Sequence, residues 1–187
     1  MNFKKLELTG FKSFFDRTTF LIEHGLTGIV GPNGCGKSNI VEALRWCMGE
    51  TSAKSMRGSG MEDVIFSGTS NKPSKNIAEV NINISNPEKS GSFQFKEMEE
   101  IEIRRKIERD KGSRFFVNDK EVRAKDAQMF FADLSTGAHS PSIISQGRIG
   151  SLVTAKPQDR RAILEEAAGI SGLHARRHEA ELRLNAA

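Results

Sequence analysis

The sequence lacks any long apolar run, and this absence limits the class of protein to which it belongs. No hydrophobic stretch approaches the roughly 18 apolar residues of a membrane-spanning helix. The first residues contain no apolar core of a signal peptide, and internal repeats and low-complexity tracts are absent. We therefore expect a globular chain without a membrane partner.

Cysteine is also scarce. The only two, Cys35 and Cys47, show no C-x-x-C spacing, which favours a reduced, cytoplasmic compartment over a disulfide scaffold. At 187 residues, with 37% hydrophobic and 28% charged content, the chain is long enough for one domain with a substantial core. Its net charge of +4 is too small to indicate nucleic-acid binding by itself.

One glycine-rich stretch, residues 26–47, organises the chain. Residues 31–38, Gly-Pro-Asn-Gly-Cys-Gly-Lys-Ser, satisfy G-x-x-x-x-G-K-[ST], the phosphate-binding loop of nucleoside triphosphatases. Residues 28–30 read as the end of a buried strand, and residues 39–48 as a helix. The apolar stripe that we expect on this helix consists of Ile40, Val41, Leu44 and Cys47.

The residue types of this loop suit phosphate chemistry. We expect Gly31, Gly34 and Gly36 to take positive φ, so that successive N–H groups point at an anion. The N-terminus of the following helix adds its positive end to the same place. Lys37 is expected to reach the β- and γ-phosphates, and the Ser38 hydroxyl to ligate Mg²⁺.

The remaining sequence predicts a mixture of strands and helices. Alternating or β-rich segments predict strands at residues 3–9, 17–22, 78–85, 93–95, 101–107, 114–117 and 142–144, with a turn at Asn118-Asp119. An antiparallel meander is the expected product of the later strands. Helices are predicted at residues 125–134 and from Pro157 to Gly169, and residues 173–187 read as a charge-laced helix cut inside a longer one.

Two charged segments have open interpretations. Arg57 lies among glycines and small residues in the segment 49–70, which reads as a flexible loop that presents the arginine. The alternative is an ordinary solvated charge, and spacing does not decide between them. The block 101–114 carries several arginines and lysines interleaved with glutamates, so it reads as a solvated strand face, or at best a diluted DNA footprint.

Several motifs together resemble one family, the SMC (structural maintenance of chromosomes) proteins of bacteria. The likeness is to the N-terminal head segment and covers essentially the whole chain. The motifs that carry it are Phe11-Lys12-Ser13-Phe14, residues 31–39, Arg57-Gly58, residues 61–66, Ser145-Gln146-Gly147 and residues 164–170.

The resemblance implies an α/β fold: the N-terminal lobe of an ABC-type (P-loop) ATPase head with an antiparallel β-meander. Residues 1–172 would form the lobe and residues 173–187 the start of a coiled-coil arm. A C-terminal lobe would supply the signature motif, the Walker B acid and the catalytic glutamate. In the full protein, ATP-driven head engagement and hydrolysis would power chromosome condensation and segregation in the cytoplasm, on the nucleoid.

The resemblance also implies roles for individual residues. Lys37, Gln146 and Arg57 would be catalytic, with Gln146 as the Q-loop residue and Arg57 coupling DNA to hydrolysis. Ser38 and Gln146 would hold Mg²⁺. ATP would be bound by Pro32, Asn33, Gly34, Cys35, Gly36, Lys37, Ser38 and Asn39. The implied partners are the C-terminal head lobe, a second SMC head as a homodimer, kleisin-type accessory subunits and double-stranded DNA.

Other parts of the ATPase machinery are not found in the sequence. Residues 170–173 lack the second glycine of an L-S-G-G-Q signature, and residues 129–133, which end in an acid, fit core packing better than a Walker B strand. We therefore expect the chain alone to hydrolyse ATP poorly. His174 and His178 stand at i, i+4, but without an evident third ligand they read as a solvated helix face.

Two alternatives stay open at this point. The nucleotide-binding domain of a transporter would share the phosphate loop and the Q-loop, although the long, β-rich segment between Lys37 and Gln146 argues against it. A non-catalytic reading makes the fragment a structural half that only docks onto a C-terminal lobe or an accessory subunit.

Overall fold

The structure is a computed structural model, which describes residues 2–87, 97–133 and 153–168, together with residues 143, 150, 177, 181, 184 and 185. The strand predicted at residues 93–95, the Q-loop segment 145–147 and both histidines of the final stretch lie outside these residues. So does most of the strand predicted at residues 142–144.

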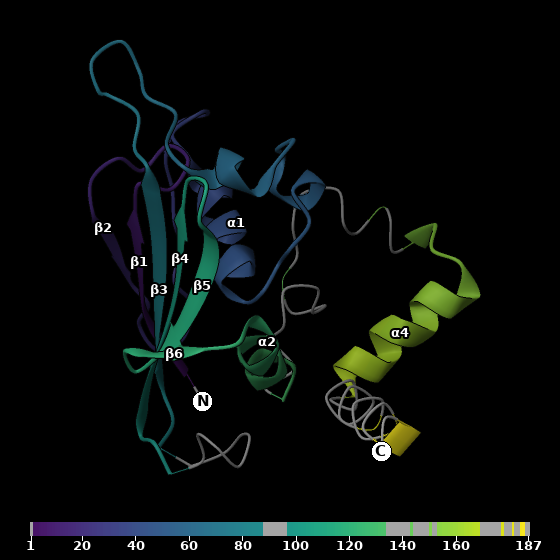
Figure 1. The fold of residues 1–187 in the computed structure, drawn as a ribbon. Coiled ribbons are helices and arrows are strands. Elements are labelled where there is room, and N and C mark those ends of the chain that lie inside the picture. Colours follow the sequence, from purple (N-terminus) through teal and green to yellow (C-terminus); the bar gives the residue numbers. More distant parts are fainter. Residues whose placement is uncertain are drawn as a thin grey trace.

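The main element of the molecule is a six-stranded antiparallel sheet in the order β2-β1-β3-β4-β5-β6, with the helices to one side of it (Figure 1). Its strands are β1 (Asn2–Thr9), β2 (Thr18–Leu21), β3 (Ile77–Ser85), β4 (Glu100–Glu108), β5 (Gly112–Val117) and β6 (Lys120–Val122). The predicted antiparallel meander is therefore confirmed for β3, β4 and β5. The N-terminal strand β1 pairs with β3, so that the two ends of a long connection meet in the middle of the sheet.

The short strand β6 was not predicted, although its turn was. Asn118 and Asp119 both take left-handed backbone conformations, with φ of 46° and 63°. Two consecutive residues of this kind match the twist of a two-residue hairpin. The turn signal in the sequence was thus correct, and the strand that follows it is too short to show a pattern.

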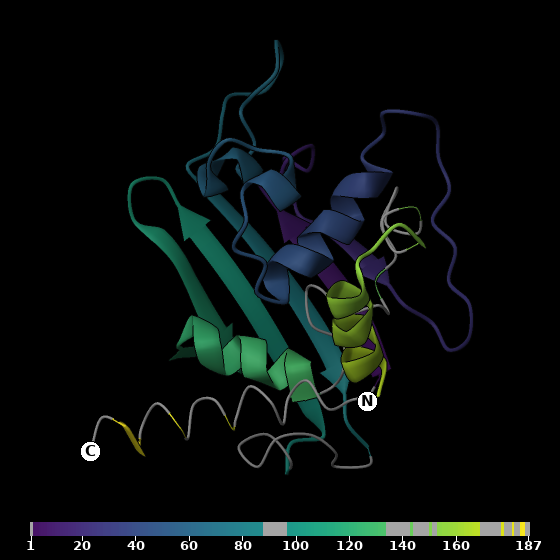
Figure 2. The ribbon, with the colours of Figure 1, turned by 90° about the vertical axis from the view of Figure 1, so that its right-hand side faces the viewer.

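One face of the sheet is covered by helices (Figure 2). Helix α1 (Lys37–Cys47) packs against β3 and β4, and α2 (Ala124–Asp133) against β5. Alternate residues of β3 and β4 point into this interface, where Trp46 of α1 lies with its ring 5.5 Å from that of Phe11. Each fully buried large apolar side chain of this kind stabilises the fold by about 1.5–3 kcal/mol.

Helix α2 settles the role of the apolar run that ends in Asp133. Ala127, Phe130 and Phe131 are buried, and the two phenylalanine rings meet edge to face with centroids 5.3 Å apart. The run is therefore helical core packing, as the sequence favoured, and not a Walker B strand. The helix α4 (Pro157–Ala167) begins at the predicted proline.

The segment between α1 and β3 differs from the predicted flexible loop. It contains two 3₁₀ helices, η1 (Lys54–Met56) and η2 (Met61–Val64), and Met56 and Val64 are buried in the core. The Asp63 carboxylate accepts hydrogen bonds from the N–H of Gly60 and from the hydroxyl and N–H of Ser59, which lower the pKa of Asp63. Buried side chains and this cap give the segment a defined shape, because its apolar residues belong to the core.

No helix in the described residues is both long and apolar enough to cross a membrane.

Candidate functional site: the phosphate loop and its arginine

The phosphate loop leads directly into α1 and leaves the start of that helix uncapped by any side chain. Gly34 and Gly36 have φ of 81° and 95°, and Gly36 is the residue before the first helical residue, Lys37. The first turn of α1 contains no acidic residue and no side-chain cap. Free N–H groups and the helix dipole therefore both favour an anion at this end.

The Lys37 ammonium lies inside the loop that precedes it. Lys37 Nζ donates to the carbonyl oxygens of Gly31 at 2.6 Å and Pro32 at 2.7 Å, and lies 3.7 Å from Cys35 Sγ. A β-carbon on Gly31 would lie 2.9 Å from Cys35 Sγ, so a side chain here would require the exposed Cys35 thiol to turn aside. Our expectation of a positive φ at Gly31 was wrong, because only Gly34 and Gly36 of the three have one.

The turn at residues 11–14 forms one wall of the loop. A β-carbon on Gly36 would lie 2.5 Å from Ser13 Oγ and 3.6 Å from the Phe14 ring. The Ser13 hydroxyl also accepts a hydrogen bond from Asn39 Nδ2 at 2.9 Å. The segment Phe-Lys-Ser-Phe therefore holds the last glycine of the loop and the first turn of α1 together.

Arg57 is attached to the phosphate-loop helix. Its Nη2 donates to Asn39 Oδ1 at 3.1 Å, and its Nε forms an ion pair with Glu42. The side chain is 58% exposed, and the backbone is left-handed with φ of 55°. The expected presentation on a flexible loop is thus corrected: Arg57 is held beside the loop by two residues of α1.

The carboxylate that binds Arg57 was missed by the sequence reasoning. Glu42 is only 8% exposed and also pairs with Lys12 Nζ, which donates in addition to the Met56 carbonyl at 2.5 Å. A glutamate inside an amphipathic helix looks like a surface charge in the sequence. The stripe predicted for this helix, Ile40, Val41, Leu44 and Cys47, gave no signal for Glu42, because the structure instead buries Ile40, Glu42, Ala43, Trp46 and Cys47.

The strand predicted before the loop does not form. Residues 28–30 have no regular structure, Val30 is 93% exposed, and Leu26 is 100% exposed. Figure 2 shows this connection between β2 and α1 running clear of the sheet. No strand in the described part of the chain pairs with these residues, so their apolar side chains stay in solvent.

The residues predicted to bind ATP, 32–39, lie together in the phosphate loop and the first turn of α1. Residues 32–35 and Ser38 are exposed, while Gly36, Lys37 and Asn39 are half-buried. Pro32 has no N–H and the Asn39 N–H donates to the Gly36 carbonyl at 2.9 Å, but the other N–H groups of the loop and the lysine fit a phosphate group, and the Ser38 hydroxyl is accessible to a bound cation. The described residues contain no group of three acidic, histidine or cysteine side chains for a metal. Gln146 lies outside the described residues, so its role stays a prediction.

One residue of the basic block is not on a solvated face. Arg105 is 3% exposed and donates from Nη1 to the carbonyls of Trp46 at 2.6 Å and Glu50 at 2.7 Å. Burial lowers the pKa of Arg105 to about 10, which leaves it charged at neutral pH. The same burial raises the pKa of the Cys47 thiol to about 12. Arg105 therefore closes the C-terminal end of α1, whose N-terminal end carries the phosphate loop.

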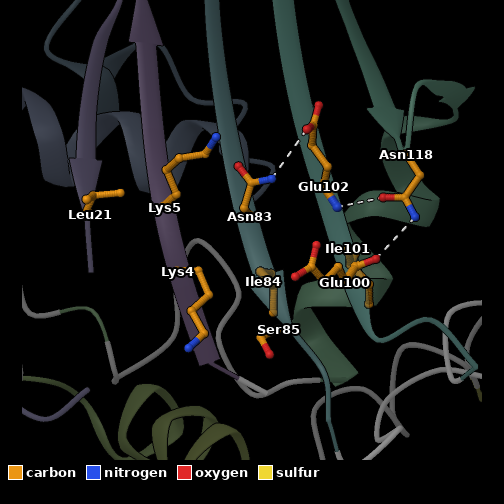
Figure 3. Close-up of a pocket in the computed structure, with 10 residues that line it drawn as sticks. All are labelled: Lys4, Lys5, Leu21, Asn83, Ile84, Ser85, Glu100, Ile101, Glu102 and Asn118. Atoms are coloured by element: carbon orange, nitrogen blue, oxygen red, sulfur yellow. Dashed lines mark hydrogen bonds between the residues drawn. The ribbon is translucent and has the colours of Figure 1, made fainter. Parts of the chain in front are cut away.

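A groove of about 570 Å³ lies elsewhere, on the sheet (Figure 3). Lys5, Asn83 and Glu102 line it and alternate along their strands with the core residues that face α1, so these three side chains point away from the phosphate loop. Asn83 Nδ2 donates to Glu102 Oε2 at 3.4 Å across the strands. This mixed-charge groove has no part in the phosphate site.

Comparisons with known proteins agree with this geometry. The family profile described as RecF/RecN/SMC N terminal domain matches residues 2–147. A chromosome partition protein Smc from Cereibacter sphaeroides is 59% identical over 186 residues, which cover 100% of this chain and 16% of that protein. The chain thus spans about a sixth of the length of the curated relatives that it matches.

Two solved structures share the fold. An SMC head bound to the C-winged helix domain of ScpA aligns with a TM-score of 0.84 and 32% identity, covering 91% of this chain and 52% of that chain. An SMC ATPase from work on ATP-driven dimerization and DNA stimulated activation aligns with a TM-score of 0.79 and 32% identity, covering 89% of this chain and 99% of that one. The predicted fold class is confirmed, while the domain boundary after residue 172 stays a prediction. The chain belongs to the RecF/RecN/SMC N-terminal domain family, as an N-terminal segment of an SMC ATPase head.

Proposed function

We propose that this chain is the ATP-binding half of a head that hydrolyses ATP only when a C-terminal lobe joins it. The observation that carries the proposal is the uncapped start of α1, with the Lys37 ammonium inside the preceding loop. An ammonium, a helix N-terminus and glycine backbone at one point favour the polyphosphate of a nucleotide. Family membership argues against the transporter alternative.

Residues of this chain would have separate tasks in the reaction. Lys37 would leave the carbonyls of Gly31 and Pro32 to neutralise phosphate charge, and the Ser38 hydroxyl would ligate Mg²⁺ together with Gln146. Phosphoryl transfer is catalysed mainly by positioning and by charge stabilisation. The lobe that supplies the catalytic glutamate would complete that environment.

The exposed segment before the loop supports a C-terminal lobe as a partner. Leu26 and Val30 are apolar and exposed, and no described strand pairs with their segment. Exposed apolar residues in an extended segment favour pairing with another strand. A sheet in the second lobe would pair with residues 28–30 and turn them into the strand that the sequence predicted.

The other partners follow from the relatives. An SMC head was solved with a domain of ScpA, and an SMC ATPase is described as dimerizing with ATP and being stimulated by DNA. We propose the same classes of partner here: a kleisin-type subunit, a second head and double-stranded DNA. In the full protein these contacts would drive chromosome condensation and segregation on the nucleoid, in the cytoplasm. Arg57 would transmit DNA binding to the nucleotide.

Lys37→Ala tests the nucleotide site. The substitution removes the point charge on the phosphates and leaves the loop backbone, so a fluorescent ATP analogue should lose most of its affinity for the full-length protein. Lys54→Ala, a lysine of η1 outside the loop, is the control. Equal affinities for the Lys37 variant and the wild type would refute the site.

Arg57→Ala tests the coupling to DNA. Basal hydrolysis and ATP affinity of the full-length protein should stay close to wild type, while the increment caused by double-stranded DNA is lost. Rates are measured with and without DNA at low and moderate salt, because phosphate contacts weaken as ionic strength rises. An unchanged increment would make Arg57 a solvated charge, and a loss of basal activity would make it a permanent ligand of the nucleotide.

A further inference from the structure

We propose that Glu42 is a positioning residue, which holds the Arg57 guanidinium beside the phosphate loop. A phosphate group then replaces Glu42 as the partner of Arg57, while Lys12 continues to neutralise the Glu42 carboxylate. This inference rests on the role proposed for Arg57. It assigns a function to Glu42 and Lys12, which belong neither to the phosphate loop nor to the nucleotide-binding residues named above.

The two oxygens of the Glu42 carboxylate are bound by two different cations. Oε1 pairs with Arg57 Nε, and Oε2 pairs with Lys12 Nζ. A nearly buried carboxylate with only one cation would lose its entire compensation when that cation left, which is strongly destabilising. With Lys12 in place, Glu42 keeps a partner when Arg57 departs.

The two cations differ in how firmly they are held. Lys12 is fixed at both ends: its N–H donates to the Val64 carbonyl at 2.7 Å and its ammonium to the Met56 carbonyl. Its side chain is largely buried, whereas that of Arg57 is more than half exposed. Exposed ion pairs are weak, so Arg57 is the partner that exchanges.

The backbone supports a specialised role for both cations. Lys12 and Arg57 each take a left-handed conformation, with φ of 47° and 55°, although neither is a glycine. Such conformations are sparsely populated and persist where the surrounding structure requires them. Here they belong to the two residues that share the Glu42 carboxylate.

The chemistry of the exchange follows from the guanidinium. Its planar set of donors binds carboxylate and phosphate oxygens with the same geometry. Glu42 follows Lys37 by five residues on α1, about 8 Å along the helix axis. Arg57 already donates to Asn39, at the end of the phosphate-loop motif, so a movement of its side chain would bring the guanidinium to the loop. A phosphate of the nucleotide or of the DNA backbone would compete with Glu42 for the same donors.

The test uses ATP hydrolysis by the full-length protein, with and without double-stranded DNA. Glu42→Gln removes the charged partner of Arg57 and leaves only its hydrogen bond to Asn39, so the rate without DNA should rise by about threefold and the stimulation by DNA should fall in proportion, as expected for loss of one half-exposed ion pair. Lys12→Gln leaves Arg57 as the sole cation on Glu42, so more DNA should be needed for half-maximal stimulation. The two variants thus act in opposite directions, which a merely structural role for Glu42 does not predict.

Two binding measurements identify the source of the phosphate. If it belongs to the nucleotide, Glu42→Gln should raise the affinity for a fluorescent ATP analogue without DNA. If it belongs to DNA, the variant should raise the affinity for a labelled duplex without nucleotide. Unchanged affinity in both would overturn the competition.

Controls separate this inference from the proposed function. The effect of Glu42→Gln should vanish in an Arg57→Ala background, and its persistence there would overturn the inference. Loss of DNA stimulation in Arg57→Ala, combined with wild-type rates in Glu42→Gln, would remove the role of Glu42 and leave that of Arg57. Thermal melting verifies folding, and if Glu42→Gln melts below the assay temperature, a wild-type DNA requirement in Lys12→Gln overturns the inference on its own.

Discussion

Replacing Arg105 by methionine should weaken the fold without touching the phosphate loop. Methionine is unbranched and fills the space of the arginine stem, but it is two atoms shorter than arginine and donates no hydrogen bond. The substitution removes the bonds to the Trp46 and Glu50 carbonyls and a third, from Nε to Ser113 Oγ at 2.7 Å. It also removes a cation that lies 4.4 Å from the centre of the Trp46 ring.

The magnitude follows from these contacts. A hydrogen bond from a charged donor contributes about 1.5–3 kcal/mol, so the two carbonyls together lose about 3–6 kcal/mol. Part of this is offset, because the Trp46 carbonyl still accepts a hydrogen bond from the Gly49 N–H at 3.1 Å. Removing a buried charge also relieves its desolvation cost. We therefore expect a net loss of about 2–4 kcal/mol.

Urea unfolding of the 187-residue chain measures this loss. Trp46 is the only tryptophan in the chain and stacks on Arg105, so its fluorescence reports on the region that is changed. Arg104→Met is the matched control: this neighbour on β4 pairs with the exposed Asp119, and its loss should cost at most about 1 kcal/mol. Equal midpoints for the two variants would refute the role of Arg105.

Three further predictions concern the chain alone. Its ATP turnover should be negligible, because in the proposed function the C-terminal lobe would supply the catalytic glutamate and the signature motif, and a purified chain as active as a complete head would contradict this. At pH 8 the exposed Cys35 should react with maleimide while Cys47, whose pKa burial raises to about 12, should react only in urea; mass spectrometry of the labelled peptides distinguishes them. Burial opposes the ionised form of Glu7, but the hydrogen bonds and charges of Arg17 and Lys5 together outweigh it and lower the pKa of Glu7. Its contribution to stability should therefore be full above the ordinary glutamate pKa and be lost as the pH falls through the lowered pKa. Glu7→Gln should reduce this acid sensitivity in urea titrations, and an unchanged pH profile would contradict the assignment.

The parts of the fold that depend on local pattern could be predicted from the sequence. Strand β3 follows strict alternation, and α1 follows a glycine-rich loop, so both were found with nearly correct ends. Arg105 shows the limit, because it occupies a core position in the alternation of β4. Its burial depends on carbonyls at the end of α1, more than fifty residues earlier in the chain, as the hydrogen bond to Trp46 shows.

The site could be predicted in its residue types but not in its contacts. Gly36, Lys37 and Ser38 follow from the motif. The attachment of Arg57 to Asn39 and Glu42 does not, because it requires that the 3₁₀ segment folds back onto α1. The prediction of a strand at residues 28–30 was wrong for the described structure. It rested on the apolar character of these residues, whereas a strand also needs a neighbouring strand with which to form hydrogen bonds.

The exposed segment before the phosphate loop would couple the proposed nucleotide binding to the proposed association of the lobes. No backbone-to-backbone hydrogen bond in the described residues involves residues 23–35, whose carbonyls accept only from the side chains of Thr27 and Lys37. A partner strand and a bound nucleotide would each restrict the backbone of this one connection, so the second to arrive has less conformational entropy to remove. If the partner lobe raises the nucleotide affinity by some factor, the nucleotide must raise the affinity between the lobes by the same factor.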